Sequence, residues 1–468
     1  MLFPSHEFLF YFLPLLLAVY YAVPDRSRRL LLVVGSYFFY GWFDPRMVSL
    51  LLVSTVVDYL CGGRIHATND PRRKKRFLTL SILINLGLLG FFKYFMFANR
   101  SLGSLFAVAG VAYPDALLSA QVVLPIGISF FTFQSMSYTI DIYRGKVRPA
   151  ANLIDFACYI AMFPQLIAGP IVRYSAIADQ LRRPVFNTAR FYLGLQFFVI
   201  GLAKKVLLAD NLAPLAEAFY DAESFAVFSS LDVVTATIAY SLQIYFDFSG
   251  YSDMAVGLGY FLGYKFPQNF ASPYKSASIS ELWRRWHITL SEWLRDYLYI
   301  PLGGSRGPRW AVYRNLGLTM LLGGLWHGAN WTYVLWGAWQ GLWLMIERPL
   351  GGRSVFHRAP RIVQVVWLHV VWSLGWLLFR AADLTASGKI FGRLVAFDLT
   401  GSQLLGQSFR LPLVVGVIGL VVAFGFRNSW EISERPTWMK SAGLALLFLL
   451  SAIALFGSVV HPFLYFQF

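Results

Sequence analysis

The sequence predicts an all-helical protein of the multi-span membrane class, and two features of its composition carry this prediction. Of its 468 residues, 57% are hydrophobic and only 14% are charged. A soluble domain usually has about 25% charged residues. With so few charges, a core this apolar cannot be covered by a water-facing surface of normal polarity. Lipid is therefore the expected solvent for most of the chain.

The distribution of the basic residues supports the same fold class. The net charge is +16, and many of the Lys and Arg residues lie in short clusters between apolar runs. Such clusters are typical of cytoplasmic loops under the positive-inside rule, and they favour anionic lipid headgroups. Without a nucleic-acid-binding motif or a single basic face, nucleic acid is not an expected partner. The clusters are 26–29, 72–76, 182–183, 204–205 and 348–361.

Apolar stretches recur along the whole chain and define the expected helices. A membrane-spanning helix needs about 20 residues. Several stretches are shorter or contain Gly and Pro, which predicts re-entrant, broken or interfacial helices. We expect about ten to twelve spans in one membrane domain over 1–468. The stretches are 8–23, 29–43, 46–62, 77–98, 103–120, 121–142, 151–169, 189–209, 226–247, 252–265, 312–326, 328–347, 362–380, 411–426 and 441–460.

One block, 264–310, differs from the rest because it is polar, basic and aromatic together. Ser278 and Glu281 have the spacing of a capping box that opens a helix. Pro301 and the glycines after it close the segment. Trp and Tyr mixed with Arg suit a helix at the level of the lipid headgroups. An apolar stripe of helical spacing follows the cap: Leu282, Trp286, Leu290 and Trp293.

His327 is the first candidate for a catalytic residue. It lies in LLGGLWHGANWTYVLWGAWQG, between two apolar segments. An ionisable group in the membrane interior is costly, so its presence suggests a function. Gly323, Gly324 and Gly328 would leave room for a substrate, and Asn330 could orient a neighbouring group. The alternative is a structural histidine with satisfied hydrogen bonds.

His287, in the polar block, is the second candidate. On the helix expected there, it shares a face with Ser291, four residues later. Arg284, Arg285 and Arg295 are close in the sequence and could pair with phosphate groups of a lipid or of a nucleotide-containing donor. The alternative is an interfacial helix whose arginines extend to the lipid headgroups.

Buried carboxylates and missing motifs narrow the chemistry. Asp141, Asp247 and Asp253 lie in apolar stretches, and we expect each to form a structural pair with an arginine. The sequence has no phosphate-binding loop, no G-x-S-x-G elbow and no zinc-binding helix. No cluster has metal-ligand spacing. A metal-free reaction is therefore favoured, in which a histidine takes the proton of an attacking hydroxyl.

Several long motifs between about residues 120 and 345 are specific enough to indicate a family. They are LPIGISFFTFQSMSYTIDIYRG (124–145), NLIDFACYIAMFPQLIAGPIVRY (152–174), YFDFSGYSDMAVGLG (245–259), ISELWRRWHITLSEWLRDYLYIPLGG (279–304) and YRNLGLTMLLGGLWHGANWTYVLWGAWQG (313–341). They resemble the membrane-bound O-acyltransferase family, and within it the membrane subunits of bacterial alginate O-acetyltransferases. The C-terminal third resembles the family only in its hydrophobicity.

This resemblance implies many helices around a central tunnel that contains the catalytic histidine. His327, in the WHG motif, corresponds to that histidine, and His287, in the RRWH motif, corresponds to the second characteristic polar position. Trp326, within the WHG motif, and Asn330 and Ser291, which follow the two motifs, are further substrate-binding candidates. The donor's nucleotide end would lie near the three arginines named above.

Four tryptophans in or beside these motifs are candidates for the tunnel wall: Trp283, Trp286, Trp326 and Trp331. Aromatic side chains of this kind are as common in lipid-facing or core positions. A tunnel-lining role and a purely structural one are therefore both open for each of them.

The resemblance also implies the reaction and the partners. Members of this branch move an acetyl group from a cytoplasmic donor, acetyl-CoA, across the bacterial inner membrane, with no tightly bound cofactor. A periplasmic partner of the SGNH-hydrolase type completes transfer to sugar hydroxyls. The acceptor would be alginate or a similar exopolysaccharide, with peptidoglycan as the alternative.

Two other function classes fit parts of the sequence. A transporter of polysaccharide precursors would suit the many spans, and it would require Asp247 or Asp253 rather than His327. A structural scaffold for a biosynthetic complex would require neither histidine. The WHG and RRWH motifs argue against both classes.

Overall fold

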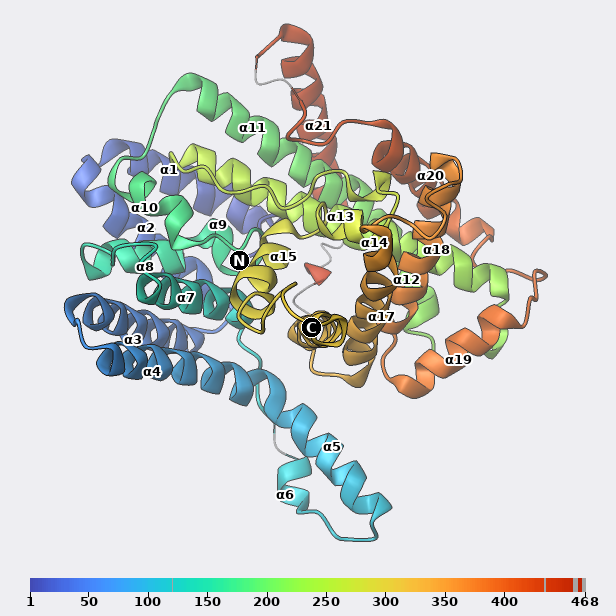
Figure 1. Ribbon diagram of the computed structural model, residues 1–468. Helices are drawn as coiled ribbons and strands as arrows, with labels where there is room; N and C mark the ends of the chain where they lie inside the picture. Colours follow the sequence, from blue (N-terminus) through green and yellow to red (C-terminus); the bar gives the residue numbers. More distant parts are fainter. Residues whose placement is uncertain (120, 433–434, 458–461, 465–468) are drawn as a thin grey trace. The chain divides into compact units, whose positions relative to one another are not determined.

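The computed structural model describes residues 1–119, 121–432, 435–457 and 462–464, and within these ranges every regular element is a helix (Figure 1). The all-helical prediction is therefore confirmed. The helices form two compact units, one of 1–187 with 259–267 and one of 188–258 with 268–468. The single domain expected over the whole chain stays a prediction, and each unit is described by itself.

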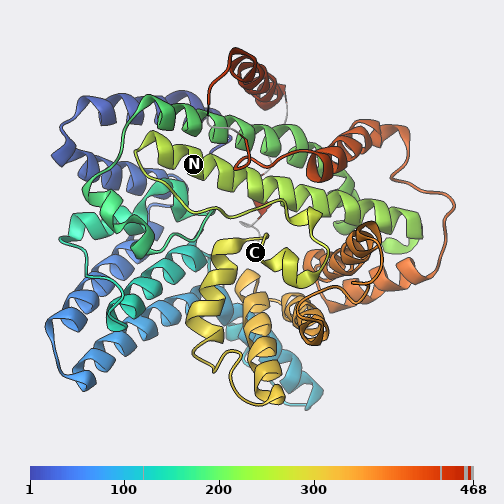
Figure 2. The same cartoon turned by 45° about the horizontal axis from the view of Figure 1, so that its top comes forward.

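The first unit contains most of the N-terminal helices. Figures 1 and 2 show that α3 and α4 run side by side. The helices are α1 (Leu13–Ala22), α2 (Asp25–Gly41), α3 (Met47–Ala67), α4 (Pro71–Leu89), α5 (Phe95–Val108), α6 (Asp115–Leu118), α7 (Ile128–Tyr143), α8 (Leu153–Ala161), α9 (Phe163–Leu166) and α10 (Tyr174–Arg182). A π-helical segment joins α4 to α5 without a break.

The second unit contains the motifs that carry both histidines. A π-helical segment, Lys204–Ala209, joins its first two helices. The helices are α11 (Thr188–Ala203), α12 (Asp210–Tyr220), α13 (Ser230–Phe261, whose last residues belong to the first unit), α14 (Ile279–Trp283), α15 (Ile288–Leu294), α16 (Arg309–His327), α17 (Trp331–Glu347), α18 (Arg361–Arg380), α19 (Leu384–Val395), α20 (Arg410–Gly425) and α21 (Trp438–Gly457).

Six helices of the described chain are long and apolar enough to cross a membrane: Met47–Ala67, Pro71–Val108, Thr188–Tyr220, Arg361–Arg380, Gln407–Gly425 and Trp438–Gly457. The expected total of ten to twelve spans stays a prediction. The separate spans expected at 77–98 and 103–120 are wrong, because one continuous helix covers Pro71–Val108. The last expected span, 441–460, is described only as far as residue 457.

A buried hydrogen-bond network joins three helices of the first unit. Asp58 of α3 is fully buried. Its carboxylate accepts hydrogen bonds from the Ser81 hydroxyl at 2.5 Å and from the Asn85 amide at 2.7 Å, both on α4. Ser81 also lies 2.9 Å from the Thr139 hydroxyl of α7. Because lipid offers no hydrogen-bond partners, these contacts hold α3, α4 and α7 in register.

The expected carboxylate pairs form with lysine. The Nζ of Lys205 lies 2.6 Å from Asp210 and 2.8 Å from Asp247, and the Nζ of Lys204 lies 2.6 Å from Asp253. The assignment of Lys204 and Lys205 to a cytoplasmic loop cluster is therefore wrong. Both lie within a helix, where an unpaired charge would be costly.

Asp141 also has a basic neighbour. In the first unit, one of its carboxylate oxygens lies 3.9 Å from the Nζ of Lys146.

For Asp247 and Asp253 the expectation of a structural pair is confirmed by the two lysines, but arginine as the partner is wrong.

The helical hairpin of α16 and α17 depends on glycines at its contact. A Cβ on Gly324 would collide with the carbonyl oxygen of Tyr333 and lie 2.9 Å from the Cα of Gly337. A Cβ on Gly337 would collide with the carbonyl oxygen of Met320. Small residues at such positions let the two backbones touch, as is common between membrane helices. The hairpin therefore holds the C-terminal end of α16, and His327 with it, close to α17.

Replacing Gly324 with alanine should destabilise the protein by about 1–3 kcal/mol, the usual cost of forcing extra volume into a packed contact. Gly317→Ala on the same helix is the matched control, because its Cβ would meet only the Met345 methyl group at 3.8 Å. Thermal unfolding in detergent would measure both variants. Equal midpoints would show that α16 and α17 can separate at no cost.

Candidate active site

A break in the helix of the polar block positions His287. The Ser278 hydroxyl accepts a hydrogen bond from the Glu281 N–H at 3.1 Å, so the predicted helix start is confirmed. The helix ends after Trp283, however, and α15 begins at Ile288. Between them, His287 has a φ of +43°. A non-glycine residue in this left-handed region is uncommon, and such strain is often found at functional sites.

The break corrects one prediction. His287 and Ser291 do not share a helix face, because His287 is the residue that precedes α15. The Ser291 hydroxyl instead lies 3.5 Å from the carbonyl oxygen of Trp286. The four residues of the predicted apolar stripe are nevertheless all buried, since the break turns α15 while keeping its apolar side inward.

Asn269 holds the ring of His287. The Nδ1 of His287 lies 3.1 Å from the Oδ1 of Asn269, which also accepts a hydrogen bond from the Thr289 hydroxyl at 2.9 Å. The other end of the amide donates to the Ser252 hydroxyl at 3.0 Å. Because the Oδ1 of Asn269 can only accept a hydrogen bond, the Nδ1 of His287 must donate one. The proton of His287 is thus placed on Nδ1, and the lone pair is on Nε2.

His287 is fully buried. Burial, and to a smaller extent the neighbouring His327, lowers the pKa of His287 well below its ordinary value. Desolvation disfavours the charged imidazolium, so His287 is neutral at physiological pH. A neutral ring with its proton on Nδ1 can accept a hydrogen bond at Nε2.

His327 ends α16 and is surrounded by aromatic rings. Its side chain is buried, and its ring centroid lies 5.1 Å from Trp326, 5.1 Å from Trp336 and 5.5 Å from Phe379. Trp326 also lies 6.0 Å from the ring of His287. One tryptophan thus contacts both histidines, and the fold brings together two residues that are separated by α15 and α16.

The glycines around His327 have a different role from the one predicted. A Cβ on Gly328 would collide with the ring of Tyr333, and Gly324 contacts α17 as described above. The expectation that these two glycines leave room for substrate is wrong, because protein atoms fill that space. Gly323 is less crowded, with the Leu294 side chain 3.2 Å from its Cβ position.

Comparison with known proteins agrees with this site. The model of the MBOAT, membrane-bound O-acyltransferase family, matches residues 121–382, a range that contains both histidines. The chain belongs to the membrane-bound O-acyltransferase family. With six candidate spans it is a multi-span membrane protein of that family, and it is an O-acyltransferase.

Relatives from several bacteria align with this O-acyltransferase, some of them over its full length. It is 40% identical over 513 residues to the probable alginate O-acetylase of Azotobacter vinelandii, covering all of both chains. It is 34% identical over 525 residues to the peptidoglycan O-acetyltransferase of Helicobacter pylori, covering all of this chain and 98% of that one. A teichoic acid D-alanyltransferase of Bacillus subtilis is 28% identical over 46% of this chain and 57% of its own.

The three arginines predicted to bind the donor of this O-acyltransferase lie at the surface or pair nearby. Arg284 is exposed. Arg285 donates to the Ala271 carbonyl at 3.1 Å and pairs with Glu281 at 3.0 Å. Arg295 is exposed and pairs with its neighbour, Asp296, at 2.7 Å. Their role in binding a donor stays a prediction.

The remaining candidates divide between the site and the scaffold. Trp326 is buried beside both histidines, whereas Trp331 is 49% exposed, which suits a lipid-facing ring. Trp286 is buried. Asn330 accepts from the Thr332 N–H at 3.2 Å and donates to the Ala382 carbonyl at 2.8 Å. These hydrogen bonds are those of a helix cap, so the structural role of Asn330 is to cap the N-terminus of α17.

Trp283 makes edge-to-face contacts with other tryptophans. Its ring centroid lies 5.9 Å from that of Trp336, which contacts His327. Sequence reasoning missed Trp336, Phe379 and Asn269 as parts of the site. An asparagine between aromatic residues, in the PQNF stretch of the polar block, was the available signal for Asn269. Within the part of the chain that the structure describes, no group of three or more His, Cys, Asp or Glu residues could hold a metal ion.

Replacing Asn269 with alanine should lower acyl transfer about tenfold, because a buried hydrogen bond that orients a ring contributes roughly 1–1.5 kcal/mol. The variant removes the acceptor at Nδ1 of His287, so the ring could rotate or change tautomer. Initial rates in proteoliposomes would measure the effect. Asn211→Ala, which removes an amide bonded only within its own helix, is the control. A rate equal to wild type would exclude Asn269 from positioning.

Proposed function

We propose that this protein takes an acetyl group from acetyl-CoA on the cytoplasmic side of the bacterial inner membrane and passes it across for O-acetylation of a cell-envelope polysaccharide. Alginate or a similar exopolysaccharide is the proposed acceptor. Full-length relatives that are named as alginate O-acetylases support this acceptor. The observation that carries the proposal is the pair of buried histidines around Trp326.

His327 is the proposed general base. It would accept the proton of the attacking hydroxyl while the hydroxyl oxygen bonds to the acetyl carbonyl carbon. The carbon–sulfur bond of the thioester then breaks, and the departing thiolate takes up the proton from the histidine. The apolar rings of Trp336 and Phe379 exclude water, which would otherwise compete with the hydroxyl as acceptor.

His287 is the proposed positioning residue. As a neutral ring with its proton on Nδ1, it accepts a hydrogen bond at Nε2 and cannot donate one there. It therefore suits the orientation of a hydroxyl or of an N–H group, and it does not suit polarisation of the acetyl carbonyl. Positioning of a substrate group is therefore the role proposed for His287.

The donor and the partner complete the proposal. Acetyl-CoA would act as a substrate, with no tightly bound cofactor, and its phosphates would pair with Arg284, Arg285 and Arg295. Trp326, Asn330 and Ser291 remain the proposed contacts for substrate near the two histidines. A periplasmic SGNH-type acetyltransferase would receive the acetyl group and transfer it to the sugar, since this sequence lacks a serine elbow of its own.

Peptidoglycan is the second candidate acceptor. The Helicobacter pylori relative named as a peptidoglycan O-acetyltransferase also aligns over all of this chain. The motifs around both histidines do not distinguish the two acceptors, because the same transfer chemistry serves either sugar hydroxyl.

Reconstituted proteoliposomes would test the proposal. Acetyl-CoA labelled in the acetyl group is supplied on one side, and a periplasmic partner with de-acetylated alginate or peptidoglycan is supplied on the other. We expect label on alginate. Label on peptidoglycan alone would move the assignment to the second acceptor. No label on either, with folded protein, would contradict acetyl transfer and favour a transporter of polysaccharide precursors.

A further inference from the structure

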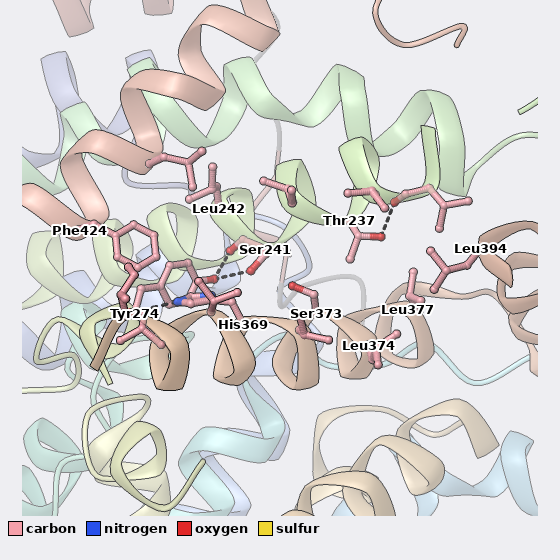
Figure 3. Close-up of a pocket in the computed structure, with 18 residues that line it drawn as sticks. Thr237, Ser241, Leu242, Tyr274, His369, Ser373, Leu374, Leu377, Leu394 and Phe424 are labelled. Atoms are coloured by element: carbon pink, nitrogen blue, oxygen red, sulfur yellow. Dashed lines mark hydrogen bonds between the residues drawn. The ribbon is translucent and has the colours of Figure 1, made fainter. Parts of the chain in front are cut away.

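An apolar groove of about 660 Å³ lies in the second unit, and neither His287 nor His327 lines it. Figure 3 shows its walls, with α13 on one side and α18 on the other. Leu394 of α19 and Phe424 of α20 complete the lining. Apart from a few hydroxyls and His369, the lining side chains are aliphatic or aromatic.

The groove opens to the outside of the unit through aliphatic side chains. Ile362, Val366 and Val370 of α18 line it and are 68%, 56% and 46% exposed. Two of the helices that line it, α18 and α20, belong to candidate membrane spans. In a bilayer this opening would face hydrocarbon. The lining is too apolar for a sugar or a nucleotide, but it matches an acyl chain.

The length of the groove suits one lipid chain. Its lining on α18 runs from Ile362 to Leu377, which is roughly 22 Å at 1.5 Å per residue. One leaflet of a bilayer has a hydrocarbon depth of about 15 Å. A chain that follows α18 could therefore extend through its leaflet within the groove.

Basic residues gather at the end of the groove marked by Ile362, Tyr274 and Phe424. Arg361 donates to the carbonyl oxygen of Lys275 at 2.8 Å. Lys275 donates through its Nζ to the carbonyl oxygen of Phe426 at 2.6 Å, and Arg427 follows in the chain.

Acidic residues only partly offset this charge. Glu281 lies 3.9 Å from Arg361 but pairs more closely with Arg285, at 3.0 Å. Glu431 accepts a hydrogen bond from the N–H of Asn428, the residue after Arg427. Three exposed or partly exposed cations thus remain at one end of an apolar groove, where a phosphate group would be favoured.

We propose that this groove binds an anionic glycerophospholipid, with an acyl chain between α13 and α18 and the phosphate beside Lys275, Arg361 and Arg427. Several polar groups of the groove lining are already paired. The Ser241 hydroxyl lies 2.8 Å from that of Tyr274, and the Nε2 of His369 donates to the Tyr274 carbonyl at 3.0 Å. A chain packed against these groups would therefore leave their hydrogen bonds intact.

A bound lipid would also support the active site. Tyr274 forms part of the groove wall, and its ring stacks on that of Trp286, at 6.2 Å between centroids and 5° between planes. Trp286 directly precedes His287. Filling the groove would thus stabilise the turn that carries His287, through one layer of aromatic rings.

Native mass spectrometry of the full chain, purified in mild detergent and exposed to phosphatidylglycerol or phosphatidylcholine, would test the proposal. We expect wild type to retain one phosphatidylglycerol, and Val366→Trp, which fills the groove, to lose it. Val417→Trp on α20 is the control, because that side chain is exposed but does not line the groove. Arg361→Gln should reduce the preference for phosphatidylglycerol about fivefold, whereas Arg410→Gln, at the opposite end of α20, should not.

Three results would overturn the proposal. Equal phosphatidylglycerol retention by Val366→Trp and wild type would place the lipid elsewhere. Equal retention of phosphatidylcholine by wild type would show that the groove holds any bilayer lipid, without recognition of charge. If Val366→Trp fails to fold, Ser373→Phe fills the same groove with a smaller change, and its retention of lipid would contradict the proposal in the same way. These readouts do not depend on acetyl transfer, so they stand apart from the proposed function.

Discussion

Replacing His327 with alanine should reduce acetyl transfer by about 10²–10⁴-fold, the range typical for loss of a general base. The ring is buried among Trp326, Trp336 and Phe379, none of which can accept a proton in its place. Transfer of labelled acetyl groups from acetyl-CoA in proteoliposomes would measure the loss. Thermal unfolding of the same preparation would show that the variant is folded.

A matched histidine elsewhere gives the control for this experiment. His66 is exposed near the end of α3, in the other unit, and His66→Ala should transfer at the wild-type rate. If His327→Ala also transferred at that rate, His327 would have no part in the chemistry. If a His327→Gln variant transferred acetyl groups at the wild-type rate, His327 would act through hydrogen bonding and not through proton transfer.

Replacing Lys205 with methionine should destabilise the protein by about 3–5 kcal/mol, the cost of breaking a buried ion pair by removing one partner. Lys205 is 2% exposed and lies between Asp210 and Asp247. Without its ammonium group, two buried carboxylates face each other with no counter-charge. Unfolding in a denaturing detergent series would measure the change against wild type.

Replacing all three charges together should restore most of this stability. A variant with Lys205→Met, Asp210→Leu and Asp247→Leu has no charge left to desolvate at this cluster, and such replacements are often neutral or stabilising. Arg46→Ala, which breaks an exposed pair with Asp44, should have little effect. A triple variant that is stable and still transfers acetyl groups would show that Asp247 is structural, contrary to the transporter class. If the triple variant remained as unstable as Lys205→Met, the three charges would contribute to stability beyond compensating one another.

The sequence indicated His327 as a candidate because it is an ionisable residue between apolar segments, and His287 because it lies in the polar, basic and aromatic block. A histidine inside an apolar run costs free energy unless it is used or satisfied, and this cost is visible without a structure. The same reasoning located the buried carboxylates Asp247 and Asp253. The predicted partner of each carboxylate was an arginine. This was wrong because nothing local in the sequence shows that Lys204 and Lys205 lie inside a helix opposite Asp253 and Asp247.

In the polar block, 264–310, the helical spacing of the apolar residues predicts which side chains are buried but does not predict where the helix breaks. Its apolar residues have helical spacing, and they are all buried, so the pattern correctly predicted which side faces inward. The left-handed turn at His287 could not be predicted, since no glycine marks it. That turn brings His287 to Asn269, eighteen residues earlier in the chain, at 3.1 Å. A contact of this kind depends on packing between segments and not on the spacing within one.

The sequence by itself determined the helical membrane class of this protein and indicated His327 and His287 as candidate site residues. Composition and apolar length are local properties, and a bilayer converts them directly into helices, because every backbone group in lipid must be hydrogen-bonded within its own segment. Only the tertiary structure decided which side chains meet. Close contact of α16 with α17 through Gly324, the orientation of His287 by Asn269 and the pairing of Lys205 all depend on distances across helices. Those distances follow from side-chain volume and shape in a close-packed interior, and no single segment of the chain contains that information.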